Sequence, residues 1–197
     1  MAQRAQAQSA RLRDVEFGLW LRLMGILPLA FFISQGVYYW RNGFGNMLWM
    51  CNIGNLVLAL GLFLDQPILI RVAVIWSIPG LAIWLRYVVM GSGASGSSTF
   101  AHIGGLIVGM AALRKIGVDR AAWRYAFGWY LVLQLVSRLV TRTELNVNVA
   151  HQVYQGWEQV FNSYWKFWVV MTLLVAAALW LLGFCLRKVW PPNAAGS

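Results

Sequence analysis

The chain has 197 residues, of which 60% are hydrophobic and 11% are charged, and its formal net charge is +10. This balance lies far outside the usual range for a soluble globular domain. Apolar runs of about 18 or more residues recur along the chain, and each is long enough to span a hydrocarbon core of about 30 Å. The sequence therefore predicts an all-α, polytopic membrane protein whose spanning helices satisfy their own backbone hydrogen bonds.

The positive charge is not of the kind that binds nucleic acid. The basic residues lie at the ends of the apolar runs rather than along one face, so no nucleic-acid partner is expected. The two cysteines, Cys51 and Cys185, are too few for a disulfide framework. The N-terminal segment is polar as far as Glu16 and has no small-residue cleavage site, so no signal peptide is expected.

Six transmembrane spans are predicted, between a polar basic tail at residues 1–16 and a short tail at residues 189–197. Together they form one transmembrane domain over residues 17–188. The spans cover about residues 17–40, 47–64, 68–90, 99–113, 122–140 and 165–186. No internal repeat divides this domain.

Two prolines and one glycine-rich segment mark expected breaks in the helices. Pro28 should kink the first span, because a proline ring clashes with the preceding helical turn. Ile78-Pro79-Gly80 should interrupt the third span in the same way. Residues 91–98 are rich in glycine and serine and are expected to form a flexible loop.

Residues 146–164 are too polar to span a membrane but show a second pattern. Val153, Trp157 and Val160 recur at helical spacing, opposite polar residues such as Gln155. Such a segment is typical of an amphipathic helix that lies flat in the membrane interface, with Asn146 or Asn148 capping its start. The sequence therefore predicts an interfacial helix between the fifth and sixth spans, forming a lid over the bundle.

The distribution of lysine and arginine predicts the orientation of the helices. An even number of spans puts both termini on one side, and the side richer in these residues is cytoplasmic. With both termini inside, the inner segments hold Arg4, Arg11, Arg13, Arg71, Arg114, Lys115, Arg120, Arg124, Arg187 and Lys188, and the outer ends hold Arg41, Arg86, Arg138, Arg142 and Lys166. We therefore expect a multi-pass protein of the bacterial inner membrane with both termini in the cytoplasm and membrane lipids as partners.

One thiol and one imidazole are expected at the same depth in the membrane. Cys51 lies about one turn inside the outer end of the second span, and His102 lies about one turn inside the outer end of the fourth. At about 1.5 Å of rise per residue, their depths match. A thiol beside an imidazole can form the thiolate–imidazolium pair that attacks an acyl carbonyl. Cys51 and His102 are therefore the candidate catalytic pair.

Small and polar neighbours favour an inward orientation for both residues. Gly105 and Gly109 share a helix face with His102, and a pair of small residues at this spacing marks close packing of another helix. Polar side chains beside Cys51 would be unfavourable in contact with lipid. The groups predicted to orient the site or hydrogen-bond an oxyanion are Asn52, Asn55, Ser98 and Thr99.

The order of these residues resembles a six-helix membrane superfamily of lipid hydrolases and transacylases. That group includes the androgen-induced Thr/His fatty-ester hydrolases, the Cys/His ether-phospholipid acyltransferases and uncharacterised bacterial relatives. The similar stretches are Met50-Cys51-Asn52 through Leu62, Trp76-Ser77-Ile78-Pro79-Gly80, Phe100-Ala101-His102-Ile103-Gly104-Gly105 and Leu145-Asn146-Val147-Asn148. The resemblance implies an acyl hydrolase or transacylase acting on lipid esters, with Cys51 as nucleophile and His102 as its base.

Four further residues on the outer side are candidates for substrate binding. Arg138 and Arg142 are suited to an anionic headgroup. His151 and Glu158 lie on the polar face of the predicted amphipathic helix. No metal site is predicted, because no carboxylate–histidine cluster lies inside a span, and acyl transfer by a thiol needs no cofactor.

Two alternatives to an enzyme remain open from the sequence. His102 and His151 are the only histidines and both fall on the outer side, so they are candidates to ligate one haem. The chain is alternatively a non-catalytic subunit or scaffold of a membrane complex, with partner membrane subunits or a second copy of itself. In that case its aromatic residues serve as interfacial anchors.

Overall fold

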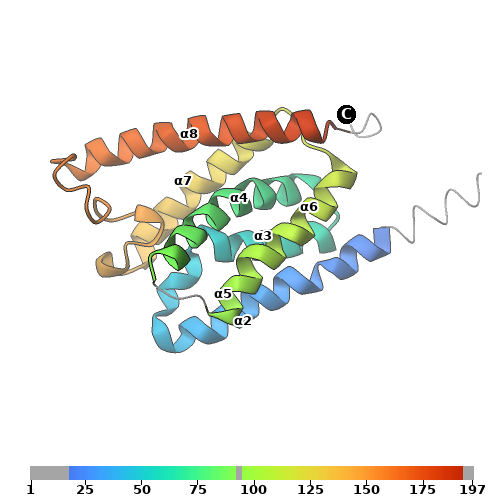
Figure 1. The fold of residues 1–197 in the computed structure, drawn as a ribbon, viewed down its shortest axis with the longest axis horizontal. Coiled ribbons are helices and arrows are strands. Elements are labelled where there is room, and N and C mark those ends of the chain that lie inside the picture. The colour runs from blue at the N-terminus through green and yellow to red at the C-terminus, as the bar shows by residue number, and fades with distance from the viewer. Residues whose placement is uncertain (1–17, 92–94, 193–197) are drawn as a thin grey trace, which may run out of the picture.

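The computed structural model describes residues 18–91 and 95–192, which are helices joined by turns and contain no strand (Figure 1). The all-α prediction is therefore confirmed. The six longer helices are α2 (Ile26–Asn42), α3 (Met50–Phe63), α4 (Pro67–Val89), α6 (Gly105–Ile116), α7 (Ala122–Val140) and α8 (Tyr164–Val189). The short ones are η1 (Phe44–Leu48), α5 (Gly96–Thr99), η2 (Phe100–Gly104), η3 (Thr143–Leu145) and η4 (Val147–Val149). The predicted tail at residues 1–16 lies outside the described residues, as do residues 193–197.

Within the described chain, four helical stretches are long and apolar enough to cross a membrane. They are Gly18–Arg41, Pro67–Val89, Gly96–Ile116 and Tyr164–Val189. These stretches agree with the first, third, fourth and sixth predicted spans. The fold is therefore compatible with a multi-pass membrane protein.

The helices at the second and fifth predicted spans, α3 and α7, are not both long and apolar enough to cross a membrane in the same way. α3 has 14 residues, which at about 1.5 Å per residue gives only about 21 Å, less than a hydrocarbon core of about 30 Å. Its predicted first residues instead form the separate 3₁₀ turn η1. α7 has 19 residues but is less apolar, because Arg124, Gln134 and Arg138 interrupt it. The count of independently spanning helices is thus four, not six.

The two prolines affect their helices differently. The first helical stretch is broken at Gly25, three residues before Pro28, and α2 begins at the next residue. This break agrees with the predicted kink. By contrast, α4 runs without a break through Pro79, so the predicted interruption of the third span is wrong. The proline removes one backbone hydrogen bond, and α4 stays helical on both sides of it.

The predicted amphipathic helix between α7 and α8 does not form. The segment contains two 3₁₀ turns followed by irregular structure as far as Ser163. Asn146, Asn148 and Val149 have φ of 41°, 53° and 58°, a left-handed conformation that an α-helix excludes. The Asn146 side chain also accepts hydrogen bonds from the backbone N–H groups of His151 and Gln152. These side-chain hydrogen bonds replace the backbone hydrogen bonds that a helix would need, so the segment does not become helical.

α4 is the centre of the bundle and packs against α3, α6 and α7 (Figure 1). Its residues 72–75 are at most 3% exposed, because helices cover it on several sides. The predicted close packing at Gly105 and Gly109 is confirmed. A methyl group added to Gly105 would lie 2.3 Å from the Asn55 Oδ1, and one added to Gly109 would lie 2.6 Å from a Val74 methyl group.

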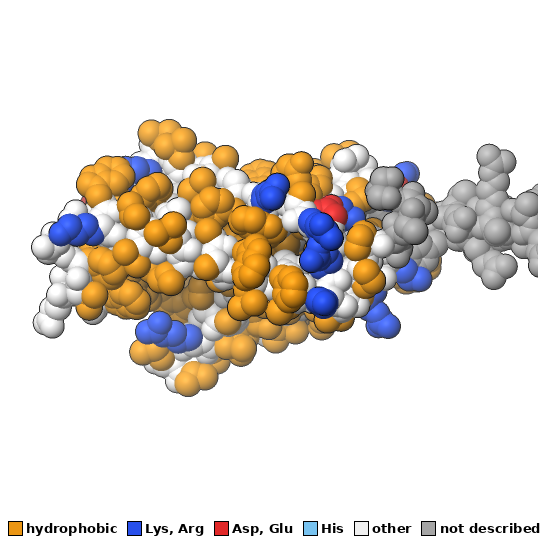
Figure 2. All heavy atoms as spheres, turned by 90° about the horizontal axis from the view of Figure 1, so that it is seen from above, with side chains coloured by type: hydrophobic (Ala, Val, Ile, Leu, Met, Phe, Trp, Pro, Cys, Tyr) orange, Lys and Arg blue, Asp and Glu red, His pale blue; other side chains and the backbone are white. Residues whose placement is uncertain are grey.

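The surface around α8 is largely apolar (Figure 2). Figure 2 shows hydrophobic side chains over most of the face on which α8 lies. Leu173, Leu174 and Trp180 on α8 are more than half exposed. Arg187 and Lys188 occupy the last turn of that helix. Such a surface is compatible with a lipid environment, in which exposed leucine and tryptophan carry no penalty.

Candidate active site

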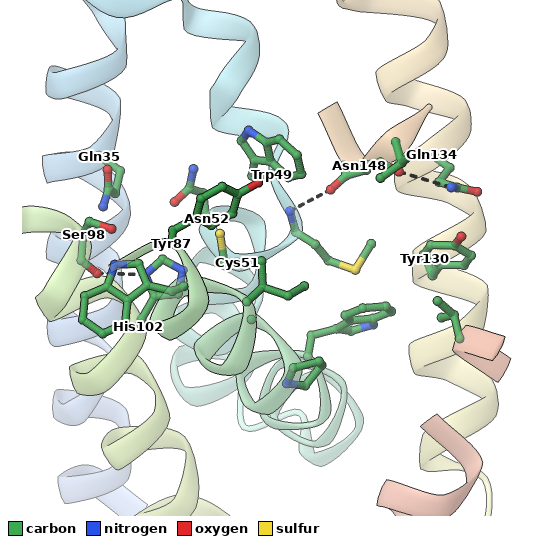
Figure 3. A pocket seen from close by; sticks show the side chains of 18 of the residues that line it. Gln35, Trp49, Cys51, Asn52, Tyr87, Ser98, His102, Tyr130, Gln134 and Asn148 are labelled. Carbon is green, nitrogen blue, oxygen red and sulfur yellow. Dashed lines mark hydrogen bonds between the residues drawn. The ribbon is translucent and has the colours of Figure 1, made fainter. Parts of the chain in front are cut away.

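One cavity of about 730 Å³ opens among the helix ends away from the basic last turn of α8 (Figure 3). Helices α2, α3, α4, α7 and α8 contribute to its wall, together with the segment from Ser95 to His102. Its aromatic lining residues are Tyr38, Tyr39, Trp49, Trp76, Trp84, Tyr87, Tyr130, Phe167 and Trp168. Its remaining polar lining residues are Gln35, Cys51, Asn52, Ser95, Ser98, His102, Gln134 and Asn148. Cys51 and His102 therefore share one chamber.

Cys51 lies in the first turn of α3, two residues after the N-cap residue Trp49. The next two backbone N–H groups, of Asn52 and Ile53, both donate to the Trp49 carbonyl at 2.9 and 3.1 Å. The N–H of Cys51 itself has no hydrogen-bond partner within residues 18–91 and 95–192. A free N–H group at a helix N-terminus can bind negative charge. The thiol is thus next to a donor for developing anionic oxygen.

His102 lies in the middle of the π-helical segment η2. π-Helical turns are rare and occur often at functional sites. The imidazole Nδ1 lies 2.8 Å from the Ser98 carbonyl oxygen, which can only accept, so Nδ1 carries the hydrogen. The ring also stacks on Trp84, with centroids 5.5 Å apart and planes at 17°. In the neutral ring Nε2 is therefore the acceptor nitrogen, which is the form that a general base requires.

The thiol and the imidazole face the cavity from neighbouring helices (Figure 3). α4 approaches Cys51 closely where Gly80 has no side chain, since a methyl group there would lie 3.5 Å from the Cys51 Cβ. No hydrogen bond joins Cys51 to His102 in the described part of the chain. Proton transfer between them would require a side-chain rotation or a bridging water, as is common in enzymes without bound substrate.

The four residues predicted to orient the site fall into two groups. Asn52 and Ser98 line the cavity, and the Asn52 amide donates to the Asn46 carbonyl at 3.1 Å. Thr99 does not line it, and its hydroxyl donates to the Ser95 carbonyl. Asn55 is 5% exposed and also lies outside the lining. Only Asn52 and Ser98 can therefore contact a bound molecule.

Asn55 instead ties the two candidate catalytic segments together. Its amide nitrogen donates to the Cys51 carbonyl at 3.0 Å and to the Ala101 carbonyl at 3.1 Å. Its Oδ1 is buried without a hydrogen-bond partner and lies against the α-carbon of Gly105. Asn55 is thus a bridge between the first turn of α3 and the π-helical segment that carries His102.

Replacing Gly105 by alanine should therefore strain this bridge. The added methyl group would overlap the Asn55 amide, so we expect a loss of about 1–3 kcal/mol, the usual range for overpacking. Thermal unfolding in detergent micelles measures the loss. Gly54→Ala is the matched control, because Gly54 is also buried but a methyl group there meets no atom within 4 Å. A Gly105→Ala protein as stable as the control would contradict the bridge.

The four predicted substrate-binding residues do not line the cavity. Arg138 donates to the Ala150 carbonyl at 2.7 Å and lies over the rings of Tyr164 and Trp165. Arg142 is exposed on the turn that follows α7. The His151 Nε2 is bonded to the Thr141 hydroxyl at 2.9 Å. Glu158 accepts a hydrogen bond from the Gly156 N–H, and it too lies in the segment that fails to form a helix.

The sequence did not predict that Asn148 and Gln134 form a buried polar network beside the site. Asn148 accepts from the Met50 N–H at 3.0 Å and donates to the Leu48 carbonyl at 2.7 Å and the Ser137 hydroxyl at 3.0 Å. Gln134 donates to the Asn148 carbonyl at 3.2 Å and accepts from the Trp168 indole at 2.9 Å. The sequence signal was a glutamine inside an apolar helix, since such a residue needs an internal partner. The network links α7, α8 and the residue before Cys51.

The fold and the cavity define a class: a helical protein with four candidate membrane spans and one largely apolar chamber that holds a thiol and an imidazole. No family model, no curated protein and no solved structure matches the chain. In the haem alternative, both histidines would coordinate one haem iron. His102 lines the cavity, whereas His151 does not.

Proposed function

We propose that the protein is an intramembrane acyl hydrolase or transacylase that acts on lipid esters through Cys51 and His102. One observation carries the proposal: a thiol at a helix N-terminus and an imidazole with an acceptor Nε2 line the same largely apolar cavity. Thiol–imidazole pairs are a recurrent basis for covalent acyl transfer. An aromatic, largely apolar lining suits an acyl chain.

In the first half of the reaction, His102 Nε2 takes the proton from the Cys51 thiol as the sulfur attacks the ester carbonyl carbon. The carbonyl oxygen becomes negative, and the free Cys51 N–H and the Asn52 amide donate hydrogen bonds to it in this proposal. The tetrahedral intermediate then collapses. The carbon–oxygen bond of the ester breaks, His102 returns the proton to the leaving alcohol, and a thioester remains on Cys51.

In the second half, His102 takes a proton from water or from an acceptor hydroxyl, and that oxygen attacks the thioester. The carbon–sulfur bond breaks and the proton returns to the thiol. Water yields a fatty acid, whereas an acceptor alcohol yields a new ester. The Ser98 carbonyl keeps the imidazole ring in the tautomer that both halves require, and stacking on Trp84 holds the orientation of the ring.

We further propose that α3 and α7 lie within the membrane beside the four longer helices, completing a six-helix domain in the bacterial inner membrane. The short α3 is supported by its packing against α2 and α4. The basic residues at the end of α8 support cytoplasmic termini. The cavity then opens on the outer side, where lipid esters of that leaflet can enter.

Labelling with an acyl-mimicking electrophile tests the chemistry. An alkyl β-lactone bearing an alkyne should acylate wild-type protein in detergent and leave a thioester on Cys51, located by mass spectrometry. Cys51→Ala should lose the label completely. His102→Gln should slow it by about 10²-fold or more, because a general base contributes about 10²–10⁴-fold.

Cys185→Ala is the matched control, since Cys185 is a free and exposed thiol on α8 that lies outside the cavity. It should label like wild type. Equal labelling of wild type, Cys51→Ala and His102→Gln would contradict the enzymatic proposal. The chain would then be better explained as a non-catalytic subunit that contacts lipids and partner membrane proteins.

A further inference from the structure

The lining of the cavity contains no lysine, arginine, aspartate or glutamate side chain among the described residues. The nearest arginine along α7, Arg138, is already engaged with the Ala150 carbonyl and two aromatic rings. Arg86 is exposed at the end of α4 and also lies outside the lining. An ionised group bound in this chamber would have no counter-charge, which is strongly unfavourable in an apolar environment.

One polar side chain in the chamber is buried and lacks a partner. Gln35 on α2 is 2% exposed and lines the cavity, and none of the described residues forms a hydrogen bond with it. In Figure 3 it lies on the same side of the chamber as Ser98 and His102. The amide lines the cavity without a protein partner in the part of the chain that the structure describes, so its two donors and one acceptor oxygen are open to a hydrogen-bonding group of a ligand.

We propose that the cavity selects an uncharged acyl ester and that Gln35 binds the hydroxyl-bearing part of that molecule. The inference rests on the proposed function for the ester, but the binding step does not require turnover. A monoacylglycerol has the required chemistry: one acyl chain for the aromatic wall, and free hydroxyl groups that can donate to and accept from an amide. A lysophosphatidate of the same chain length replaces one hydroxyl with a phosphate and should be excluded.

Photo-crosslinking compares these two molecules directly. Diazirine-bearing monooleoylglycerol and oleoyl lysophosphatidate are added at equal mole fractions to the full-length protein in neutral detergent micelles, and crosslinked peptides are mapped. We expect the neutral lipid to crosslink to cavity residues at least ten-fold more than the anionic one. Gln35→Leu should reduce crosslinking of the neutral lipid about five- to ten-fold, the effect of one or two neutral hydrogen bonds.

Two further variants serve as a control and as a charge-introduction test. Gln66→Leu is the control, because Gln66 is exposed in the turn between α3 and α4 and should leave crosslinking unchanged. Gln35→Lys should raise crosslinking of the lysophosphatidate, because it supplies the missing positive charge; it also keeps the test informative if Gln35→Leu fails to fold. Equal crosslinking of both lipids in wild type, or an unchanged Gln35→Leu protein, would overturn the proposal. If neutral-lipid binding holds while Cys51 fails to acylate, only the enzymatic proposal is lost.

Discussion

Asn148→Ala should destabilise the protein by about 4 kcal/mol and disorganise the first turn of α3. The side chain makes three hydrogen bonds, to the Met50 N–H, the Leu48 carbonyl and the Ser137 hydroxyl. At about 1 kcal/mol each, with buried partners left unsatisfied, their loss costs about 3 kcal/mol. Alanine at φ 53° adds about 1 kcal/mol, because it lacks the short polar side chain that lets asparagine adopt the left-handed conformation more readily.

Thermal unfolding in detergent, combined with the rate of Cys51 alkylation by a small maleimide, measures both effects. Asn148→Gly separates the two causes, since glycine tolerates the left-handed conformation but also loses the side chain. It should be less destabilised than Asn148→Ala by about 1 kcal/mol. We expect the alkylation rate of Cys51 to change in both variants, because Met50 directly precedes the thiol. Melting within a degree of wild type would show that Asn148 does not hold this turn.

The backbone around Asn148 shows why so many contacts are needed there. Val149 is β-branched yet has φ 58°, a conformation that is unfavourable for such a residue. The Tyr164 hydroxyl donates to the Val149 and Ala150 carbonyls, and Arg138 donates to the Ala150 carbonyl. The strained turn is therefore held from α7 and α8, and it directs Asn148 toward the residue that precedes Cys51.

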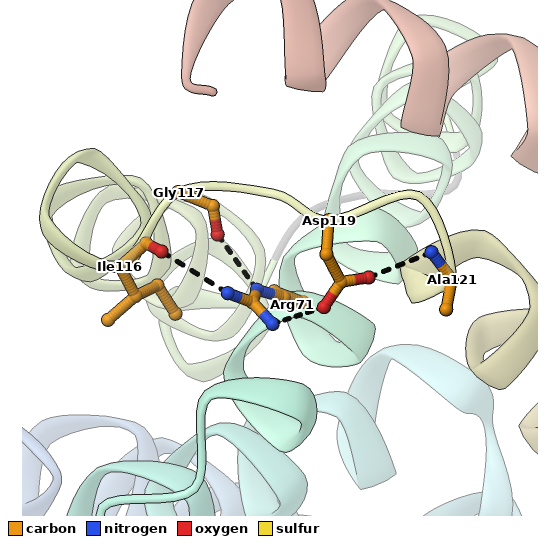
Figure 4. Close-up of polar contacts among 5 residues, drawn as sticks. All are labelled: Arg71, Ile116, Gly117, Asp119 and Ala121. Carbon is orange, nitrogen blue, oxygen red and sulfur yellow. Dashed lines mark hydrogen bonds and ion pairs between the residues drawn. The ribbon is translucent and has the colours of Figure 1, made fainter. Parts of the chain in front are cut away.

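Arg71→Gln should cost about 2–3 kcal/mol at the opposite end of the bundle (Figure 4). The Arg71 guanidinium donates to the Gly117 carbonyl at 2.8 Å and the Ile116 carbonyl at 3.2 Å, and it pairs with Asp119. These carbonyls end α6, where no further helical N–H can reach them. Asp119 in turn accepts from the Ala121 N–H at 2.8 Å, just before α7 begins. One side chain thus joins α4, α6 and the start of α7.

The exposed pair Arg22–Asp65 provides the control for Arg71. Its side chains are 56% and 68% exposed with charged atoms 3.8 Å apart, whereas the Arg71 side chain is 14% exposed. Arg22→Gln should therefore lower the free energy of unfolding by less than about 0.5 kcal/mol, and its melting temperature should stay close to that of wild type. Arg71→Lys should recover only part of the loss, because an ammonium cannot reach three acceptors in the fork geometry of guanidinium. Equal effects of Arg71→Gln and Arg22→Gln would contradict the proposed joint.

Much of the helical architecture follows from the sequence alone, because the length of an apolar run and its flanking breaks are local properties. Four of the six predicted spans correspond to long apolar helices close to the expected bounds. The matched depth of Cys51 and His102 likewise predicted a shared chamber, and both residues do line one cavity. Their catalytic roles stay a prediction, which the labelling of Cys51 tests.

Only the tertiary structure decided where α3 begins, which polar groups face the chamber and what the segment after α7 becomes. Helical periodicity in residues 146–164 was overridden by asparagine side chains that bind distant backbone groups, such as the Met50 N–H. Arg138 has the right charge for a headgroup. Its guanidinium is instead bound to the Ala150 carbonyl and lies over the Trp165 ring, and both residues come close to it only in the folded protein. Gln35, a glutamine inside an apolar span, indicates an internal position, but whether its amide has a partner is defined only once every helix is packed around it. Periodicity and hydropathy are set by neighbours along the chain, whereas the composition of a cavity is set by residues that meet only after folding.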